Sequence, residues 1–466
     1  MLVIGGTHSG CGKSTVTLGL LSALMKLGHA VQPFKCGPDF IDAGLHAMVA
    51  GRPSRNLDTW MCGDQYVLDS VKRHTAGAGL AVIEGVMGLF DGGQRSTAGL
   101  ARLLRANMVL VIDAYGMAES AGAIAGGFCA YDGCAVIKGV IFNRVSSRGH
   151  YERLKSSLRG IECLGYLPRR GAYSIPSRHL GLTVAEEDPI SETGLNKLTD
   201  AVIENIDMGK IAELARVDNP PVPALPAGTV NPPVCRPAAA AGAEVRIAVA
   251  RDKAFCFYYE DNLDMLQEAG ARMLPFSPLS DESLPEGTDA VYLGGGYPEI
   301  YAEALSGNKK MLEAVKNWAT AGGPVFAECG GFMYLGRGIR QGESFYPLCG
   351  VFPINTALME KPVLGYREAA LSSGCILGEK GNKLRGHEFH YSRVEKVESE
   401  EKPEVRFNVM GEAPGTETIS SALCKNTLGG YTHFHFGSDP QTAVRMVEYI
   451  RKRQKAAATA GTDGGR

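Results

Sequence analysis

A cysteine at the end of an apolar run is the first residue whose setting could do chemistry. Residues 324–331 read Pro-Val-Phe-Ala-Glu-Cys-Gly-Gly, so Cys329 closes a predicted strand and precedes two glycines. A sharp strand-to-helix turn would expose the thiol at its apex, and a helix N-terminus lowers the pKa of a thiol. A buried core cysteine is the ordinary alternative, because cysteine packs like a small hydrophobic residue.

Two other segments favour a reactive thiol over a core cysteine. A run of three glycines, Gly294–Gly296, follows an apolar stretch and could offer backbone N–H groups to an oxyanion. From these segments we expect Gly295 and Gly330 as the oxyanion donors. Near the C-terminus the segment Tyr-Thr-His-Phe-His-Phe supplies His433 or His435 as a general base.

The strongest local pattern is the glycine-rich segment GTHSGCGKST, residues 6–15, between a predicted strand and a predicted helix. Such a loop turns its backbone N–H groups towards one centre, where the helix N-terminus adds positive potential for phosphate. We expect Lys13 to neutralise the β- and γ-phosphates of ATP and the Ser14 hydroxyl to hold Mg²⁺. The other residues predicted to bind the nucleotide from this loop are Gly10, Gly12 and Thr15. The spacing departs from the common GxxxxGK[ST] form, because Thr7 stands where the first glycine would be.

Carboxylates follow two of the predicted strands. The segment KCGPDFID places Lys35, Asp39 and Asp42 after the second strand, and Glu84 closes the apolar run 80–83. Ligand groups gather at the carboxyl ends of strands in open α/β sheets, so these side chains should face the phosphates. We predict that Lys35, Asp39, Asp42 and Glu84 act in substrate activation, and that Asp42 and Glu84 join Ser14 as Mg²⁺ ligands. Asp39 and Asp42 could instead form a turn and a helix cap, and Glu84 could serve a buried structural partner.

Two further polar segments have an open role. Asn143, in VIFNRV at another strand end, could hydrogen-bond an adenine edge or simply occupy a turn. The segment GHEFHYS carries His387, Glu388 and His390, but alternation along a strand would put the two histidines on opposite faces. We therefore favour a substrate-facing or interdomain role over a metal site, with an ordinary strand as the alternative.

The elements that must position these residues read as an α/β fold. Apolar β-branched runs alternate with amphipathic stretches in both halves, which is typical of parallel sheets flanked by helices. We predict two doubly wound, mainly parallel domains. The strands expected from these runs span residues 2–5, 30–34, 80–85, 108–113, 136–142, 162–166, 245–250, 289–296 and 324–329.

A proline-rich segment separates the halves. Seven prolines lie between Pro220 and Pro237, and proline removes backbone donors and fixes φ, so this stretch reads as a semi-rigid tether. We predict an ATP-binding domain at 1–210, a linker at 211–244, a second domain at 245–453 and a flexible tail at 454–466.

Composition narrows the class of protein. The 466 residues carry 48 basic and 50 acidic side chains, a balance that gives no field for holding nucleic acid or an anionic membrane. We find no apolar run long enough to span a bilayer and no signal peptide in MLVIGGTHSG, so we expect a cytoplasmic protein. The 12 cysteines include no CxxC pair, which argues against structural zinc. A homodimer is left open.

Several motifs together carry a family resemblance. GTHSGCGKST resembles the loop of dethiobiotin synthetase-like enzymes; the partitioning ATPases have a second lysine where this chain has His8. With KCGPDFID, NLDTWM, VIEGVMGLFDG and SRHLGL, the chain resembles the cobyrinate a,c-diamide synthase family of corrinoid amidotransferases from its first residue to about Phe436. That family converts two acetate side chains of a corrin ring to amides through acyl phosphates, using ATP, Mg²⁺ and glutamine. The resemblance implies the same for this chain, and brings Arg178 and His179 near the substrate.

The C-terminal half resembles the class I glutamine amidotransferases. The likeness implies that Cys329 attacks the glutamine carboxamide and that His433 moves the proton, since the Tyr-x-His pattern favours His433 over His435. The usual His-Pro-Glu of that class is absent, as it is in corrinoid amidotransferases generally, so the group that orients His433 is not identified.

Other functions stay open at this point. The same chemistry could act on another ring, such as hydrogenobyrinate or nickel-sirohydrochlorin, because residue types do not separate these substrates. From a different class comes an ATP-binding regulatory scaffold with an inactive amidotransferase domain. It would bind ATP without turning over glutamine, which a glutaminase assay detects.

Overall fold

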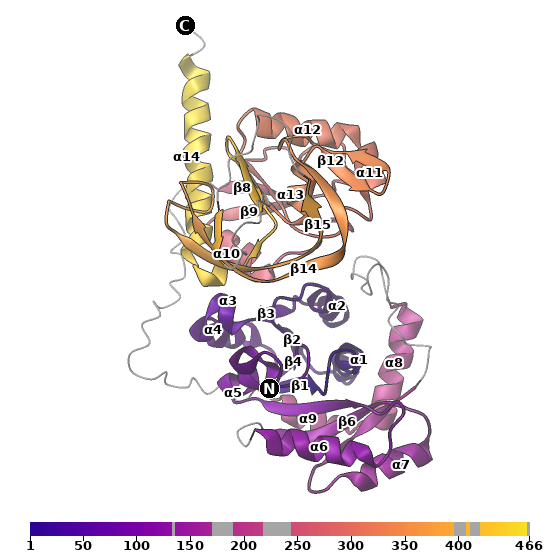
Figure 1. The fold of residues 1–466 in the computed structure, drawn as a ribbon. Helices are drawn as coiled ribbons and strands as arrows, with labels where there is room; N and C mark the ends of the chain where they lie inside the picture. The colour runs from indigo at the N-terminus through magenta and orange to yellow at the C-terminus, as the bar shows by residue number, and fades with distance from the viewer. Residues whose placement is uncertain (133–135, 170–189, 218–243, 396–406, 411–419, 464–466) are drawn as a thin grey trace. The chain divides into compact units, whose positions relative to one another are not determined.

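The structure is a computed structural model, which describes residues 1–132, 136–169, 190–217, 244–395, 407–410 and 420–463. The chain divides into two compact units, Met1–Asn231 and Pro232–Arg466. Figure 1 shows the elements of each unit. Within the described residues, no helix combines the length and the apolar character that crossing a bilayer requires.

The first unit is built on one parallel sheet of seven strands in the order β3-β2-β4-β1-β5-β6-β7. The strands are β1 (Leu2–Gly6), β2 (Val31–Cys36), β3 (Arg55–Leu57), β4 (Leu80–Glu84), β5 (Asn107–Asp113), β6 (Ile137–Val145) and β7 (Cys163–Pro168). The helices are α1 (Lys13–Lys26), α2 (Ile41–Ala50), α3 (Thr59–Cys62), α4 (Asp64–Thr75), α5 (Thr97–Leu104), α6 (Ser120–Tyr131), α7 (Arg148–Ser157), α8 (Glu192–Asn205) and α9 (Met208–Ala215).

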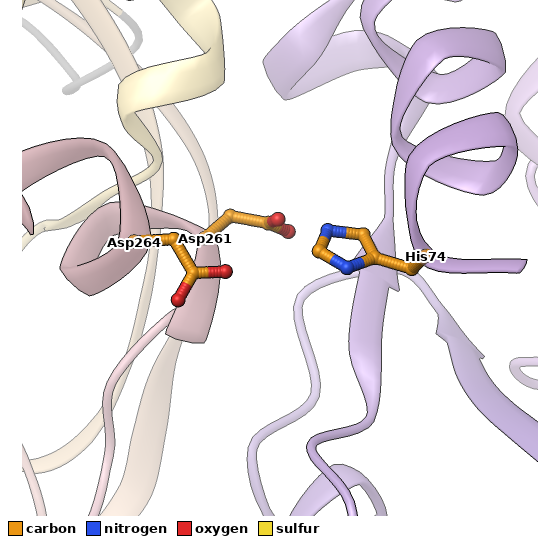
Figure 2. Close-up of side chains that lie close together, drawn as sticks. All are labelled: His74, Asp261 and Asp264. Atoms are coloured by element: carbon orange, nitrogen blue, oxygen red, sulfur yellow. The ribbon is translucent and has the colours of Figure 1, made fainter. Parts of the chain in front are cut away.

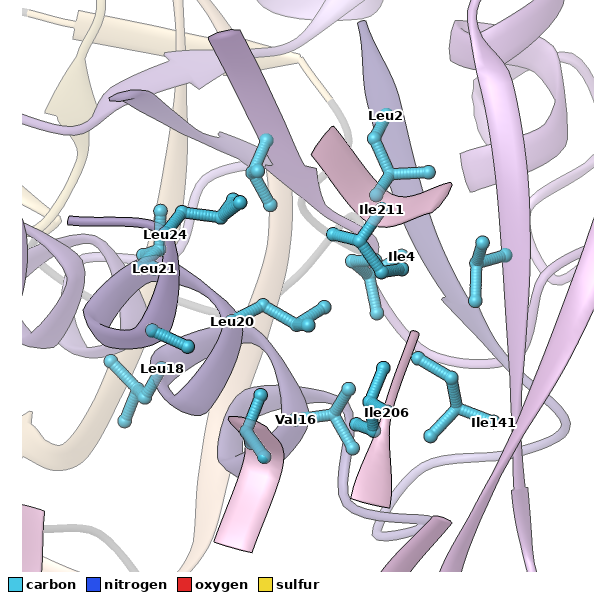
Figure 3. Close-up of a cluster of buried hydrophobic side chains, with 14 of the residues drawn as sticks. Leu2, Ile4, Val16, Leu18, Leu20, Leu21, Leu24, Ile141, Ile206 and Ile211 are labelled. Atoms are coloured by element: carbon cyan, nitrogen blue, oxygen red, sulfur yellow. The ribbon is translucent and has the colours of Figure 1, made fainter. Parts of the chain in front are cut away.

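Both faces of this sheet are buried, which explains why its strands are almost entirely apolar. On one face Leu2 and Ile4 of β1 pack with α1, α8 and α9, as Figure 3 shows. On the other face Val3 of β1 packs in a second cluster with residues of α4, α5, α6 and α7. Because alternate residues of β1 enter opposite clusters, the sheet is the middle layer of a three-layer α/β unit.

The second unit contains two sheets. A six-stranded sheet has the order β17-β18-β11-β10-β8-β9 and is parallel except for the β17–β18 pair. Its strands are β8 (Val245–Ala250), β9 (Ala271–Phe276), β10 (Ala290–Leu293), β11 (Val325–Glu328), β17 (Ser421–Cys424) and β18 (Thr427–Gly430). The helices of the unit are α10 (Glu260–Glu268), α11 (Ala302–Gly307), α12 (Lys309–Thr320), α13 (Gly330–Leu335) and α14 (Gln441–Asp463).

The other sheet of this unit is mainly antiparallel and was not predicted. It has the order β13-β12-β14-β15-β19, and β16 pairs with β14. Its strands are β12 (Gly338–Gln341), β13 (Ser344–Pro347), β14 (Asn355–Leu371), β15 (Lys383–Val394), β16 (Phe407–Met410) and β19 (His433–Phe434). The long strands β14 and β15 are visible as curved ribbons in Figure 1. Their pairing is irregular between Leu358 and Val363.

The predicted parallel strands all occur, with ends within a few residues of the expected ones, so the α/β prediction is confirmed. The ordered structure extends beyond two of the predicted boundaries. Helix α9 continues past residue 210 because Ile211 and Leu214 enter the core of the first unit. Helix α14 runs to Asp463, through most of the stretch predicted as a flexible tail, since its Lys, Arg, Gln and Ala residues favour helix. Linker residues 218–243 lie outside the described residues.

Candidate functional site

The N-terminal glycine loop, residues 6–12, joins β1 to α1. Gly10 and Gly12 have φ of +83° and +95°, a region that favours glycine and lets the chain curl before the helix. Gly6 is needed for a different reason, because a Cβ there would lie 2.4 Å from the Cys11 sulfur. The Lys13 Nζ donates to the Met87 carbonyl at 2.7 Å, so this ammonium lies across the mouth of the loop next to the segment that follows β4.

Five side chains meet at the carboxyl ends of β2 and β4, beside this loop. Glu84 is fully buried, and its Oε1 accepts from the Ser14 hydroxyl at 2.7 Å and from the Lys35 Nζ at 3.0 Å. Lys35 also donates to Asp42 Oδ2 at 2.5 Å. The other Glu84 oxygen, Oε2, lies 2.6 Å from the His46 Nε2. The prediction that Ser14, Lys35, Asp42 and Glu84 converge therefore agrees with the geometry, and His46 is an addition to it.

The charges in this cluster are unequal. Burial alone would raise the pKa of Glu84, but Lys35 and the hydrogen bond from His46 outweigh burial and hold it below its usual range. Burial, and then the neighbouring Glu84, raise the pKa of Asp42 to about 7 despite Lys35. Burial opposes the charge of Lys35 too, yet Asp42 and Glu84 outweigh it and raise its pKa. One ammonium thus serves two carboxylates, and the second carboxylate would ionise more readily beside a further cation.

Asp39 stabilises the turn that leads into α2. Its Oδ1 accepts the backbone N–H of Asp42 at 2.9 Å at the start of α2. The Asn56 side chain then fixes the same turn by donating to the carbonyls of Gly37 and Asp39, both at 2.8 Å. Sequence reasoning missed Asn56 and His46. For His46 a signal existed, because it lies four residues after Asp42 on α2 and so shares its face.

Asn143 supports the glycine loop in this structure. Its Nδ2 donates to the Cys11 carbonyl at 3.0 Å, and its Oδ1 accepts from the Arg144 backbone at 2.9 Å. A Cβ on Gly12 would lie only 1.9 Å from the same Nδ2. The nitrogen and the oxygen of the amide each make one bond to backbone, and the contact with an adenine edge stays a prediction. Arg178 and His179 lie outside the described residues.

In the second unit, Cys329 lies at a strained turn between β11 and α13. Its φ is +46° and ψ is −101°, a conformation that a non-glycine residue rarely adopts. The Cys329 N–H donates to the Gly430 carbonyl at 2.7 Å, which ties the turn to β18. Gly331, two residues after Cys329, has no room for a side chain, because a Cβ there would lie 2.3 Å from the Leu293 carbonyl oxygen of β10.

The loop Gly294–Gly296 lies against both His433 and the Cys329 turn. A Cβ on Gly295 would lie 2.2 Å from Cε1 of the His433 ring, and a Cβ on Gly330 would lie 3.1 Å from the Gly296 nitrogen. The imidazole and the turn therefore border the same loop. The Gly295 N–H is already donated to the Phe257 carbonyl at 3.2 Å, which argues against the predicted pair of Gly295 and Gly330 as oxyanion donors, whereas the Gly296 nitrogen lies next to Gly330.

Burial controls the protonation of this pair. Burial, and then Glu299, raise the pKa of the Cys329 thiol, which is the opposite of the lowering predicted from the helix N-terminus. That helix has only 6 residues, and Cys329 is only 4% exposed, so loss of hydration dominates. Burial, and then His387 and His390, lower the pKa of His433 to about 3. A neutral imidazole beside a protonated thiol is the resting state that these shifts favour.

His435 has structural partners instead. Its Nδ1 accepts the Gly437 N–H at 3.0 Å, and its Nε2 lies 3.8 Å from Oδ2 of Asp261. Asp261 is carried by α10 together with Asp264, and Figure 2 draws both side chains. The geometry therefore favours His433 over His435 at the site, in line with the sequence pattern.

The GHEFHYS segment lies in β15, next to the strand that carries His433. His387 is opposite His433 in the register of the two strands. His390 stacks on Tyr431, with ring centroids 3.8 Å apart and planes 10° from parallel. Burial, the largest cause in each case, lowers the pKa of both histidines to about 4, so each is neutral at neutral pH.

Comparison with known proteins gives the same division of the chain. Residues 2–182 match the CobQ/CobB/MinD/ParA nucleotide binding domain, and residues 246–441 match the CobB/CobQ-like glutamine amidotransferase domain. A cobyrinate a,c-diamide synthase of Syntrophotalea carbinolica is 41% identical over 97% of this chain and 98% of its own length. A cobyrinate a,c-diamide synthase of Limosilactobacillus reuteri is 36% identical over 96% of this chain and 98% of its own length. Among solved structures, a chain of PurLQS from Thermotoga maritima covers 44% of this chain and 99% of its own, with 15% identity and a TM-score of 0.35.

A nucleotide-binding α/β domain followed by a glutamine amidotransferase domain defines a glutamine-dependent amidating ligase. Given the extent and level of identity to its curated relatives, the chain belongs to the cobyrinate a,c-diamide synthase family.

Proposed function

We propose that this protein amidates the a- and c-acetate carboxylates of cobyrinic acid, with ATP to activate each carboxylate and glutamine to supply the nitrogen. The observation that carries the proposal is that one chain holds both a Ser14–Lys35–Glu84 cluster beside a glycine loop and a Cys329 turn beside His433. The names of the relatives supply the ring and the two positions.

In the glutaminase half, we assign Cys329 as the nucleophile and His433 as the general base. The thiol proton passes to the neutral imidazole as sulfur attacks the carboxamide carbon of glutamine. The same proton then reaches the departing nitrogen, so ammonia leaves and a glutamyl thioester remains, which water hydrolyses to glutamate. The Gly296 and Gly330 N–H groups would stabilise the oxyanion of each tetrahedral intermediate. A raised thiol pKa fits this scheme, because the thiolate forms only as the base accepts the proton.

In the synthetase half, a corrin carboxylate oxygen attacks the γ-phosphorus of ATP, and ADP leaves. Ammonia then attacks the acyl phosphate carbon, the amide forms and inorganic phosphate leaves. Hydroxide or oxide is too poor a leaving group for direct amidation, which is why phosphorylation must come first. We assign phosphate binding to Lys13 and to the backbone N–H groups of the loop, together with Gly10, Gly12 and Thr15. We assign Lys35 to neutralise negative charge where the two carboxylates and the substrate carboxylate meet.

The donor set at this position suits Mg²⁺. It combines the Ser14 hydroxyl with the carboxylates of Glu84 and Asp42, and hard oxygen ligands of this kind are what Mg²⁺ prefers. Lys35 alone leaves the second carboxylate poorly compensated, as the raised pKa of Asp42 indicates. When bound, Mg²⁺ would neutralise part of the phosphate charge, and Glu84, Asp42 and Ser14 would hold it.

The test is amidation of cobyrinic acid followed by mass spectrometry, with glutamine or ammonium chloride as nitrogen source. We expect two successive amidations with either source for the wild type, ammonium-dependent amidation only for Cys329→Ala, and neither for Lys13→Ala. Hydrogenobyrinate and nickel-sirohydrochlorin, run in parallel, separate the ring alternatives. A wild-type protein that binds ATP but amidates none of the rings from ammonium would refute the proposal.

A further inference from the structure

The residue that usually orients the catalytic imidazole in class I amidotransferases is replaced in this chain. His435 stands two residues after His433, where that class carries a glutamate, and its ring is bound to Gly437. The strand that presents His433 is also very short, because β19 consists of His433 and Phe434 alone. Two ladder positions against β15 fix a strand weakly, so other contacts must hold the imidazole in place.

One such contact comes from the residue immediately before Cys329. The Glu328 Oε1 accepts the backbone N–H of Phe434 at 2.8 Å, and its Oε2 accepts the Tyr292 hydroxyl at 2.7 Å. Glu328 is 2% exposed and is the last residue of β11. A single side chain thus joins the end of the strand that leads to Cys329 to the residue that follows His433.

A second buried carboxylate binds the residue on the other side. The Glu388 Oε1 accepts the Thr432 hydroxyl at 2.7 Å, and its Oε2 accepts from the Arg367 Nε at 2.9 Å. Glu388 lies on β15 between His387 and His390, and like Glu328 it is 2% exposed. The residues before and after His433 are therefore each hydrogen-bonded to a different buried glutamate.

We propose that Glu328 and Glu388 are positioning residues that together take over the role of the absent third carboxylate, by holding the Phe434 backbone and the Thr432 side chain on either side of His433. The inference rests on the proposed role of His433 as the base. Both glutamates are buried, so water cannot replace the hydrogen bonds that they accept. Burial, and then His387 and His390 of β15, lower the pKa of His433.

The sharpest test uses Thr432, because its hydroxyl can be removed without changing the shape of the side chain. Thr432→Val should lower kcat for glutamine hydrolysis about tenfold, with KM for glutamine changed less than about twofold. Thr432→Ser restores the hydroxyl and should recover most of the rate. The matched control is Thr320→Val, the same change at the exposed end of α12.

The rate must be expressed per folded molecule, measured from the amplitude of the thermal melt, so that partial misfolding does not count as a catalytic effect. Alkylation of Cys329 by iodoacetamide, followed across pH by peptide mass spectrometry, then reports thiolate formation. We expect alkylation to slow with kcat in Thr432→Val and to recover in Thr432→Ser. A second arm compares Glu328→Ala, which removes the acceptor for Phe434, with Glu328→Gln, which keeps it; only the alanine variant should lose about tenfold or more.

The outcomes separate this inference from the proposed function. If the wild type does not hydrolyse glutamine, the assignment of Cys329 and His433 fails. If it does, and Thr432→Val keeps the wild-type kcat and alkylation profile, the positioning role of Glu388 is refuted. Equal losses in Thr432→Val and Thr432→Ser would also refute it, because the hydroxyl would then be irrelevant.

Discussion

Replacing Gly295 by alanine should disable the glutaminase half through a single methyl group. An ideal Cβ at this position lies 2.2 Å from Cε1 of His433, more than an ångström inside ordinary van der Waals contact. The loop is not free to retreat, because Gly295 exchanges two backbone hydrogen bonds with Phe257, at 3.0 and 3.2 Å. The ring must therefore move, and it is buried, with no solvent to move into.

A displacement of about 1 Å at a catalytic group costs about 100-fold in rate, or ~2.7 kcal/mol in the activation free energy. We accordingly expect Gly295→Ala to lower kcat for glutamine hydrolysis by roughly that factor. Amidation driven by ammonium chloride should stay at the wild-type rate, since it bypasses the glutaminase half.

The assay measures glutamate release and ammonium-driven amide formation on the same preparation. Gly307→Ala, at the end of α11, is the matched control, because a Cβ there meets no heavy atom within 4 Å. Full glutaminase activity in Gly295→Ala would show that His433 does not lie against this loop during catalysis, and the reasoning from close approach would be wrong.

Three further changes test other parts of the molecule. Gly12→Ala should weaken ATP binding at least about tenfold in a calorimetric titration, because φ is +95° and the new Cβ would lie 1.9 Å from Asn143; unchanged affinity would contradict the loop geometry. Glu84→Gln should reduce ammonium-driven amidation about 100-fold and raise the Mg²⁺ concentration needed for half-maximal rate, since an amide cannot balance Lys35 or bind the cation as tightly; a wild-type Mg²⁺ curve would argue against the ligand assignment. Burial raises the pKa of Glu328 from 4.5 to about 8, so the folded state binds more protons than the unfolded state between these values and loses stability as pH rises through them. Glu328→Gln removes that titration, so the melting temperature of the variant should rise relative to that of the wild type between pH 5 and pH 8. A constant difference between the two melting temperatures over this range would refute the raised pKa of Glu328.

The parallel strands could be read from the sequence because burial on both faces leaves an unbroken apolar run. The runs that precede Gly6, Glu84 and Cys329 all become strands that deliver a loop or a side chain to a site. The antiparallel sheet of the second unit gives no such signal. Strand β14 mixes charged and apolar residues, contains Pro362 and Gly365, and pairs irregularly with β15, so its period of two is obscured.

Some site residues could likewise be predicted from the sequence and others could not. Lys13 and Ser14 act within a local motif, so their types and spacing carry the information. His46 and Glu388 act through contacts with residues 38 and 44 positions away in the chain, and no local pattern reports such pairs. The predicted lowering of the Cys329 pKa failed because it counted a helix N-terminus and could not count the loss of water around the sulfur.

The protonated state of the Cys329 thiol bears on how the protein tolerates oxidants. Peroxide attacks thiolates and reaches exposed sulfur first, and Cys329 is neither ionised at rest nor open to solvent. Aerobic handling should therefore spare this sulfur from conversion to sulfenic acid while glutamine is absent. In the proposed mechanism the thiol loses its proton only as sulfur bonds to the glutamine carbon, so turnover should not expose a free thiolate to peroxide either.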